Sequence, residues 1–159
     1  MGSIISSKNK QLLQGEQNLQ PPCICTPGEC PVDGNCTQKE VIYQATVETQ
    51  NQEIFKYIGL TEKPFKERFI KHESSFRVHD PRNATSLSKK ILELQRKHIL
   101  FEVEWEILQK SKSYSAGAQE CRLCINEIYH ILTADNILNS RNEFFNKCRH
   151  KNKFKLSSK

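Results

Sequence analysis

The sequence contains no apolar run long enough to cross a lipid bilayer, so we expect no membrane-spanning segment and no membrane partner. It also opens without the hydrophobic stretch of a secretory signal, and its seven cysteines, an odd number, cannot all pair within the chain. These absences disfavour a secreted, disulfide-stabilised protein. We therefore expect a reducing, intracellular location, and specifically a nuclear one.

Length and charge narrow the remaining choices. A chain of 159 residues is too short for two ordinary domains and suits one domain with flexible ends. We expect a flexible arm over residues 1–22, which are rich in Ser, Asn, Gln and Lys, one folded domain over 23–156, and a tail over 157–159. The net charge of +6 favours an acidic partner, of which nucleic acid is the commonest.

Three segments are rich in apolar residues at the two-residue spacing of a β-strand. The first covers residues 41–48, and a turn at 51–52 leads to a second over 54–58. The third, over 101–107, alternates large apolar residues with glutamates. Because glutamates two apart on a strand point outward in a row, we expect them to lie in solvent. The three segments predict an antiparallel sheet.

Helical periodicity occurs between and after these strands. Pro64 opens one helix, whose apolar stripe continues to Phe76, and a second helix begins near Thr85. The longest helical pattern covers residues 115–133. The residues of this pattern that we expect to be buried are Cys121, Cys124, Ile125, Ile128, Ile131 and Leu132. The predicted fold class is therefore α+β, a small three-stranded antiparallel sheet flanked by helices.

The cysteines predict a metal-stabilised element. Four of them lie in a turn-rich loop that has too little apolar mass to hold itself together: Cys23, Cys25, Cys30 and Cys36. Cys121 and Cys124 form a C-x-x-C half-site of the kind that chelates zinc. We predict one structural Zn²⁺ bound by Cys30, Cys36, Cys121 and Cys124, with Cys25, Cys148 and His150 as alternative ligands.

Short motifs on the predicted hairpin and the next helix indicate a function. Ile42-Tyr43 lies on the first strand, and Tyr57-Ile58-Gly59 ends the second. Arg68 and His72 lie one helical turn apart on the same face. In order and spacing these motifs resemble the signature of the GIY-YIG nuclease family, with Val41 in place of the usual leading glycine. The resemblance implies a GIY-YIG-like fold and hydrolysis of DNA phosphodiesters.

The resemblance also implies roles for single residues. Glu127 would hold one Mg²⁺ or Mn²⁺, although periodicity alone favours an exposed helix edge for it, and Arg68 would neutralise the phosphate. Either Tyr43 or His72 would act as the base. Asn139 would fix neighbouring groups by hydrogen bonds. The full set of predicted catalytic residues is Tyr43, Tyr57, Arg68, His72, Glu127 and Asn139.

Basic residues supply candidate contacts to DNA. Two lysines lie on the second predicted helix, and from Lys147 onward a base stands at nearly every second position with no acid before the end. A solvated helix face and a frayed terminus are the plainer interpretations. Beside a nuclease signature, we predict phosphate contacts by Lys89, Lys90, Arg149, Lys151 and Lys153.

The cysteines extend the resemblance. C-P-V-D-G-N-C at 30–36, C-R-L-C at 121–124 and K-C-R-H at 147–150 look like the endonuclease domains of Penelope-like retroelements. This implies nicking of target DNA to prime reverse transcription, with a reverse transcriptase and element RNA as partners. One alternative is a zinc-stabilised nucleic-acid-binding module without catalysis, which Val41 favours. Another is a repair-type GIY-YIG nuclease, which would not predict the cysteine groups.

Overall fold

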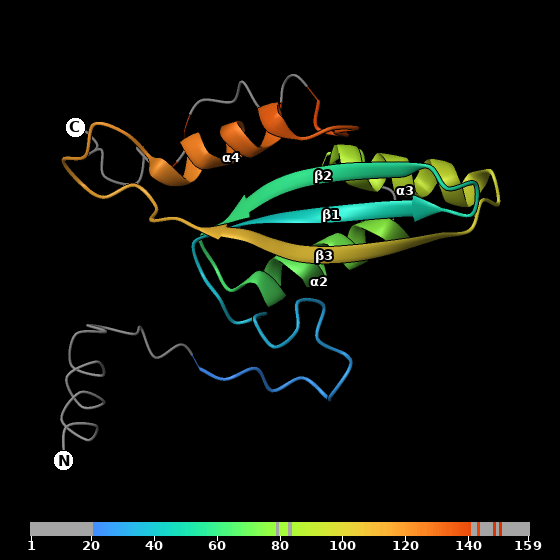
Figure 1. Cartoon of the computed structure of the whole chain (residues 1–159), viewed down its shortest axis with the longest axis horizontal. Helices are drawn as coiled ribbons and strands as arrows, with labels where there is room; N and C mark the ends of the chain where they lie inside the picture. The colour runs from blue at the N-terminus through green and yellow to red at the C-terminus, as the bar shows by residue number, and fades with distance from the viewer. Residues whose placement is uncertain are drawn as a thin grey trace, which may run out of the picture.

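The structure is a computed structural model that describes residues 21–140, apart from residues 79 and 83, together with Glu143, Cys148 and His150. The predicted tail, and all but the last two residues of the predicted arm, lie outside this range. The described part contains one antiparallel sheet and three helices (Figure 1).

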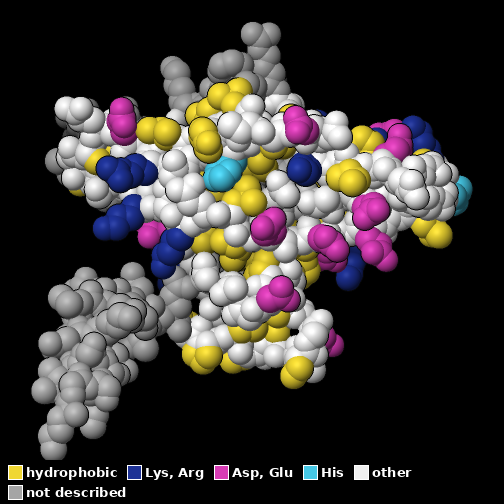
Figure 2. Space-filling model, viewed as in Figure 1, with side chains coloured by type: hydrophobic (Ala, Val, Ile, Leu, Met, Phe, Trp, Pro, Cys, Tyr) yellow, Lys and Arg dark blue, Asp and Glu magenta, His cyan; other side chains and the backbone are white. Residues whose placement is uncertain are grey.

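The sheet has three strands in the order β2-β1-β3. They are β1 (Val41–Thr49), β2 (Ile54–Thr61) and β3 (Phe101–Lys110), and both outer strands run antiparallel to β1. The predicted hairpin and third strand are thus confirmed. On β3 the glutamates are exposed, as alternation predicts, and Figure 2 shows acidic side chains gathered over this strand.

Both faces of β1 are covered, because helices pack on each side of the sheet (Figure 1). The helices α2 (Phe65–Arg77) and α3 (Ser86–Arg96) share one hydrophobic cluster with Tyr43 and its same-face neighbours on β1. The helix α4 (Arg122–Thr133) forms a second cluster with Ile42 on the opposite face. The first strand in the chain is therefore the centre of the molecule, which agrees with the predicted α+β class.

Local chemistry fixes where two of the helices begin. Pro64 stands at the N-cap of α2, where its missing N–H is of no consequence. The Thr85 side chain caps α3 and forms a reciprocal capping box with Ser88. Both starts agree with the sequence predictions. Within the part of the chain that the structure describes, no helix is long and apolar enough to cross a membrane.

The start of α4 differs from the prediction. Residues 115–121 are not helical and include a turn at 116–117, with Gly117 in the left-handed region at φ 84°, so the helix begins only at Arg122. Two residues predicted to be buried, Ile125 and Leu132, are 45% and 65% exposed. Their predicted burial was wrong because α4 packs against the sheet with one face only, and its opposite face, which also carries apolar residues, is exposed to solvent.

Part of the outer edge of β2 is covered by another segment of the chain. A short segment after α4 lies beside it, through a parallel bridge between Lys56 and Ile137. The Lys56 N–H donates to the Asn136 carbonyl at 3.0 Å, and the Leu138 N–H donates to the Lys56 carbonyl at 2.6 Å. This segment brings Asn139 against the second strand.

Candidate functional site

Tyr43, Arg68 and His72 form a continuous hydrogen-bonded group between β1 and α2. The Arg68 Nε–H donates to the Tyr43 hydroxyl at 2.9 Å, and the same hydroxyl lies 2.8 Å from the His72 Nε2. Tyr57, from β2, places its ring edge-on to His72 with 5.7 Å between ring centroids. The structure therefore brings together four of the six predicted catalytic residues.

Gly59 explains how the tyrosine ring reaches this position. Tyr43 pairs with Gly59 across the β1–β2 ladder, and a Cβ at residue 59 would lie 2.5 Å from the Tyr43 hydroxyl oxygen and 2.6 Å from its Cζ. Only a residue without a side chain permits this approach. The glycine in the Y-I-G triplet thus has a packing role that sequence reasoning did not assign.

Glu127 and Asn139 meet the outer edge of β2 next to this group. The Glu127 carboxylate lies close enough to the Leu60 main chain for this contact to lower its pKa. The Asn139 side chain accepts from the Ile58 N–H at 2.9 Å and donates to the Ile58 carbonyl at 2.7 Å. Because Ile58 and Leu60 are two apart, their outward main-chain groups lie on the same strand edge. Glu127 is partly buried, not at an exposed helix edge as periodicity alone favoured.

Burial and charge shape the protonation states of the group. Burial raises the pKa of Tyr43 to about 12, and the positive charge of Arg68 opposes this rise. Burial also raises the pKa of Tyr57. Burial and the Arg68 charge lower the pKa of His72 to about 3, so at neutral pH its imidazole is uncharged. Perturbed groups gathered in this way are typical of functional sites.

A second carboxylate, Glu143, acts on the same group and was missed by sequence reasoning. Burial and the negative charge of Glu143 raise the pKa of Glu127 to about 7, while Arg68 lowers it. Glu143 itself accepts from the Ser86 N–H at 3.1 Å and the Ser86 hydroxyl at 2.7 Å. The segment that carries it has no periodic pattern, so nothing in the sequence singled it out.

Comparisons with protein families, curated proteins and solved structures find no match. The chemistry of these side chains is therefore what indicates a function. An uncharged imidazole, two phenols, a guanidinium and a half-buried carboxylate offer proton acceptors, a phosphate-binding fork and one site for a hard cation.

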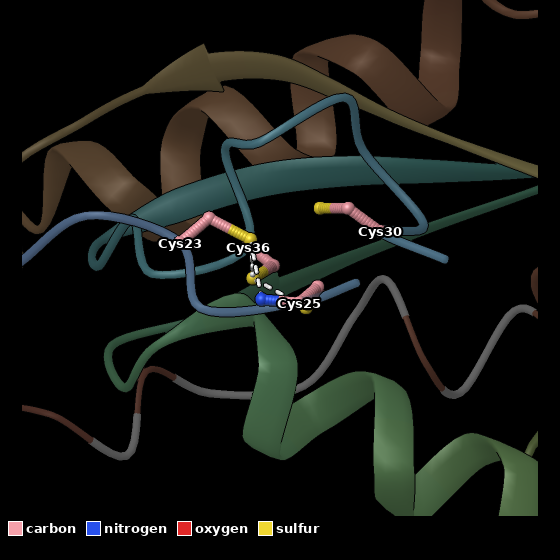
Figure 3. A group of neighbouring side chains, drawn as sticks. All are labelled: Cys23, Cys25, Cys30 and Cys36. Carbon is pink, nitrogen blue, oxygen red and sulfur yellow. Dashed lines mark hydrogen bonds between the residues drawn. The ribbon is translucent and has the colours of Figure 1, made fainter. Parts of the chain in front are cut away.

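The cysteines form two separate groups, each of which can hold a metal ion. In each group the ligand atoms all lie within 4.8 Å of one another. The first consists of Cys23, Cys25, Cys30 and Cys36 in the loop before β1 (Figure 3). The second consists of Cys121, Cys124, Cys148 and His150. Because metal sites need ligands that converge on one point, both groups meet the first requirement for a tetrahedral ion.

This grouping corrects the predicted ligand set. Cys30 and Cys36 were expected to share an ion with Cys121 and Cys124, and the structure divides these two pairs between the two groups. The loop before β1 folds back so that its own four thiols meet, with 3.3 Å between the sulfurs of Cys23 and Cys36. The spacing in the sequence identified the candidate ligands but not the three-dimensional path that groups them.

The distances in the second group fit a tetrahedral centre. The His150 Nδ1 lies 3.4 Å from the Cys121 sulfur, 3.2 Å from the Cys124 sulfur and 3.6 Å from the Cys148 sulfur. Usual zinc bond lengths at tetrahedral angles would place such atoms about 3.6 Å apart. Burial and neighbouring thiols raise the pKa of Cys124, so thiolates here require a cation for charge balance.

The predicted DNA contacts are only partly described. Lys89 is exposed on α3. Lys90 lies 3.6 Å from the Glu93 carboxylate and places its ammonium 4.2 Å from the centroid of the Phe55 ring. Both interactions hold Lys90 against the protein, and they make Lys89 the better placed of the two for a phosphate. Arg149, Lys151 and Lys153 lie outside the described residues.

Proposed function

We propose that the chain is a divalent-metal-dependent endonuclease that hydrolyses phosphodiesters of DNA. The observation that carries this proposal is the chain of contacts from Arg68 through the Tyr43 hydroxyl to His72, with Glu127 close enough for the Arg68 charge to lower its pKa. Their resemblance to the GIY-YIG signature supports the same conclusion.

The proton path follows from the hydrogen bonds. Arg68 can only donate, so the Tyr43 oxygen accepts from it and leaves its own proton free to be donated to the His72 Nε2. The uncharged His72 can accept that proton only transiently, because burial and the Arg68 charge disfavour its imidazolium form. We infer that Tyr43 takes the proton of the attacking water as it passes its own to His72, which removes the need for a stable tyrosinate in a buried site.

Glu127 fits a Mg²⁺ or Mn²⁺ ion. Such ions bind through one or two carboxylates plus water and phosphate oxygens, and a half-buried carboxylate whose pKa is raised to about 7 is stabilised by a cation. When bound, the ion supplies Lewis-acid polarisation of the phosphate. Arg68 also interacts with Tyr57, and the remaining N–H donors of its guanidinium would bind a phosphate oxygen and offset its developing negative charge.

We further propose that both cysteine groups hold structural Zn²⁺, since thiolate and imidazole ligands at tetrahedral spacing favour this ion. The exposed glutamates on β3 would repel a DNA backbone, so the duplex would approach by another face. The resemblance to Penelope-like retroelements extends the proposal to nicking of target DNA for primed reverse transcription, with a reverse transcriptase and element RNA as partners.

A supercoiled plasmid with Mg²⁺ tests the catalytic proposal. The wild type should convert it to the open circle, and Arg68→Ala and Glu127→Gln should each slow this by about a hundredfold or more. Glu104→Gln, which alters an exposed glutamate on β3, is the matched control and should nick at the wild-type rate. Equal rates for all four proteins would exclude this site as the source of the activity.

Val41, which stands where the GIY-YIG signature usually has its leading glycine, favours the second candidate, a zinc-stabilised nucleic-acid-binding module without catalysis. Its side chain is fully buried in the core, where it packs with the α2 and α3 cluster. Plasmid binding without nicking, measured by fluorescence anisotropy and gel electrophoresis on the same wild-type sample, would establish this candidate in place of the first.

A further inference from the structure

His150 faces two kinds of partner with its two ring nitrogens. Its Nδ1 points into the group of three thiols described above, at 3.2 to 3.6 Å. Its Nε2 lies 3.6 Å from the Glu62 Oε2, which is ion-pair distance. The histidine side chain is 11% exposed and the glutamate side chain 25%, so the contact is largely shielded from solvent.

This arrangement is the one expected of a metal-bound histidine. A histidine that binds a metal through one nitrogen usually donates the other N–H to a carboxylate or carbonyl, which fixes the ring orientation and strengthens the ligand. With Nδ1 turned to the thiols, Nε2 is the nitrogen that would carry the proton of a metal-bound His150, and it faces the Glu62 carboxylate 3.6 Å away. The carboxylate thus favours the tautomer that a metal requires.

The turn that joins β2 to α2 fixes the main chain at Glu62. The buried Thr61 hydroxyl donates to the Lys63 carbonyl and accepts from the Lys63 N–H, both at 3.2 Å. These two bonds close the main chain tightly around residue 62. The main-chain position from which the Glu62 side chain extends is therefore set by local structure, independently of His150.

We propose that Glu62 is the positioning residue that orients His150 as an Nδ1 ligand of a thiophilic divalent ion, with Cys121, Cys124 and Cys148 as the other ligands. This rests on the zinc proposal above. The ion and its outer carboxylate join three parts of the chain that are distant in sequence: the start of α4, the turn before α2, and the segment that contains His150.

The experiment uses the full chain loaded with Cd²⁺, because cadmium NMR gives separate resonances for a site with four sulfurs and a site with three sulfurs and a nitrogen. Glu62→Ala should lower about tenfold the chelator concentration that removes half of the ion from the Cys₃His site. The Cys₄ resonance should resist chelator as in the wild type. Glu67→Ala, which removes an exposed carboxylate near the start of α2, should change neither site.

Each outcome is decisive. Unchanged chelator resistance of the Cys₃His resonance in Glu62→Ala would overturn the role of Glu62 while leaving the zinc proposal intact. A wild-type spectrum without a Cys₃His resonance would overturn the zinc proposal itself. If Glu62→Ala fails to fold by circular dichroism, the nearly isosteric Glu62→Gln serves instead, and it should shift the Cys₃His resonance without moving the Cys₄ resonance.

Discussion

His72 and Glu127 should give the free energy of unfolding opposite dependences on pH between pH 4.5 and 6.5. His72 has a pKa of about 3 in the folded protein, against an ordinary value of 6.5. Glu127 has a folded pKa of about 7, against an ordinary value of 4.5. The two shifts therefore act over the same pH range, and they have opposite signs.

For His72 the folded pKa is depressed, so its contribution is present above pH 6.5 and is lost as the pH falls towards 3. In that range the unfolded chain binds a proton that the folded protein does not bind. For Glu127 the folded pKa is raised, so its contribution is present below pH 4.5 and is lost as the pH rises towards 7. Each slope is about 1 kcal/mol per pH unit from pH 5 to 6.

The contributions of these two residues to the pH dependence of the unfolding free energy should consequently nearly cancel in the wild type. Replacing one residue should expose the slope that the other contributes. In His72→Gln, stability should fall as the pH rises from 5 to 6, relative to the wild type. In Glu127→Gln it should rise, by about the same amount. Urea unfolding at several pH values without added Mg²⁺ measures these slopes, and the wild-type comparison cancels every group that the proteins share. Parallel slopes for all three proteins would refute the assigned protonation states.

Three further outcomes are expected. Gly59→Ala should lower the free energy of unfolding, measured in urea, by about 1–3 kcal/mol, because the new Cβ meets the buried Tyr43 ring. Adding Tyr43→Phe to this variant should not restore stability, since the ring Cζ remains in contact. A Gly59→Ala protein as stable as the wild type would contradict this packing. Asn139→Ala should cost about 1–3 kcal/mol and speed hydrogen exchange of the Ile58 amide, whereas unchanged exchange would argue against the paired bonds. A strong chelator should remove two zinc ions per chain, as counted by mass spectrometry, and should lower the melting temperature. Omitting Mg²⁺ should stop nicking but leave the melting temperature unchanged.

The sheet was predictable because burial on alternate sides leaves a period of two in the sequence. The register of Tyr43 opposite Gly59 was not predictable, although both residues were in the motif. The start of α4 was misplaced because the chain turns before it enters the helix. Contacts distant in sequence hold the segment that leads to this turn: the Ser113 N–H donates to the Glu40 carboxylate at 3.0 Å. Local periodicity carries no information about such a contact.

The resemblance predicted the residues of the candidate site, but periodicity and spacing alone did not predict how they come together. Arg68 and His72 share a helix face by spacing alone, but only the fold brings them to Tyr43. The metal ligands show the same limit more strongly, because His150 returns to the start of α4 from a distant segment. Glu143 was missed since its effect on Glu127 depends entirely on tertiary structure.

The pairing of Lys56 with the segment after α4 limits how two copies of this protein can associate. That segment occupies the outward main-chain groups of Lys56, and the Asn139 side chain occupies those of Ile58, so a second sheet cannot add along this part of β2. The other edge, β3, exposes a row of glutamates that would repel the same row on an antiparallel neighbour. If the protein nicks DNA as proposed, cutting both strands of a duplex would therefore require two subunits that meet through helices or loops, or two successive visits by one.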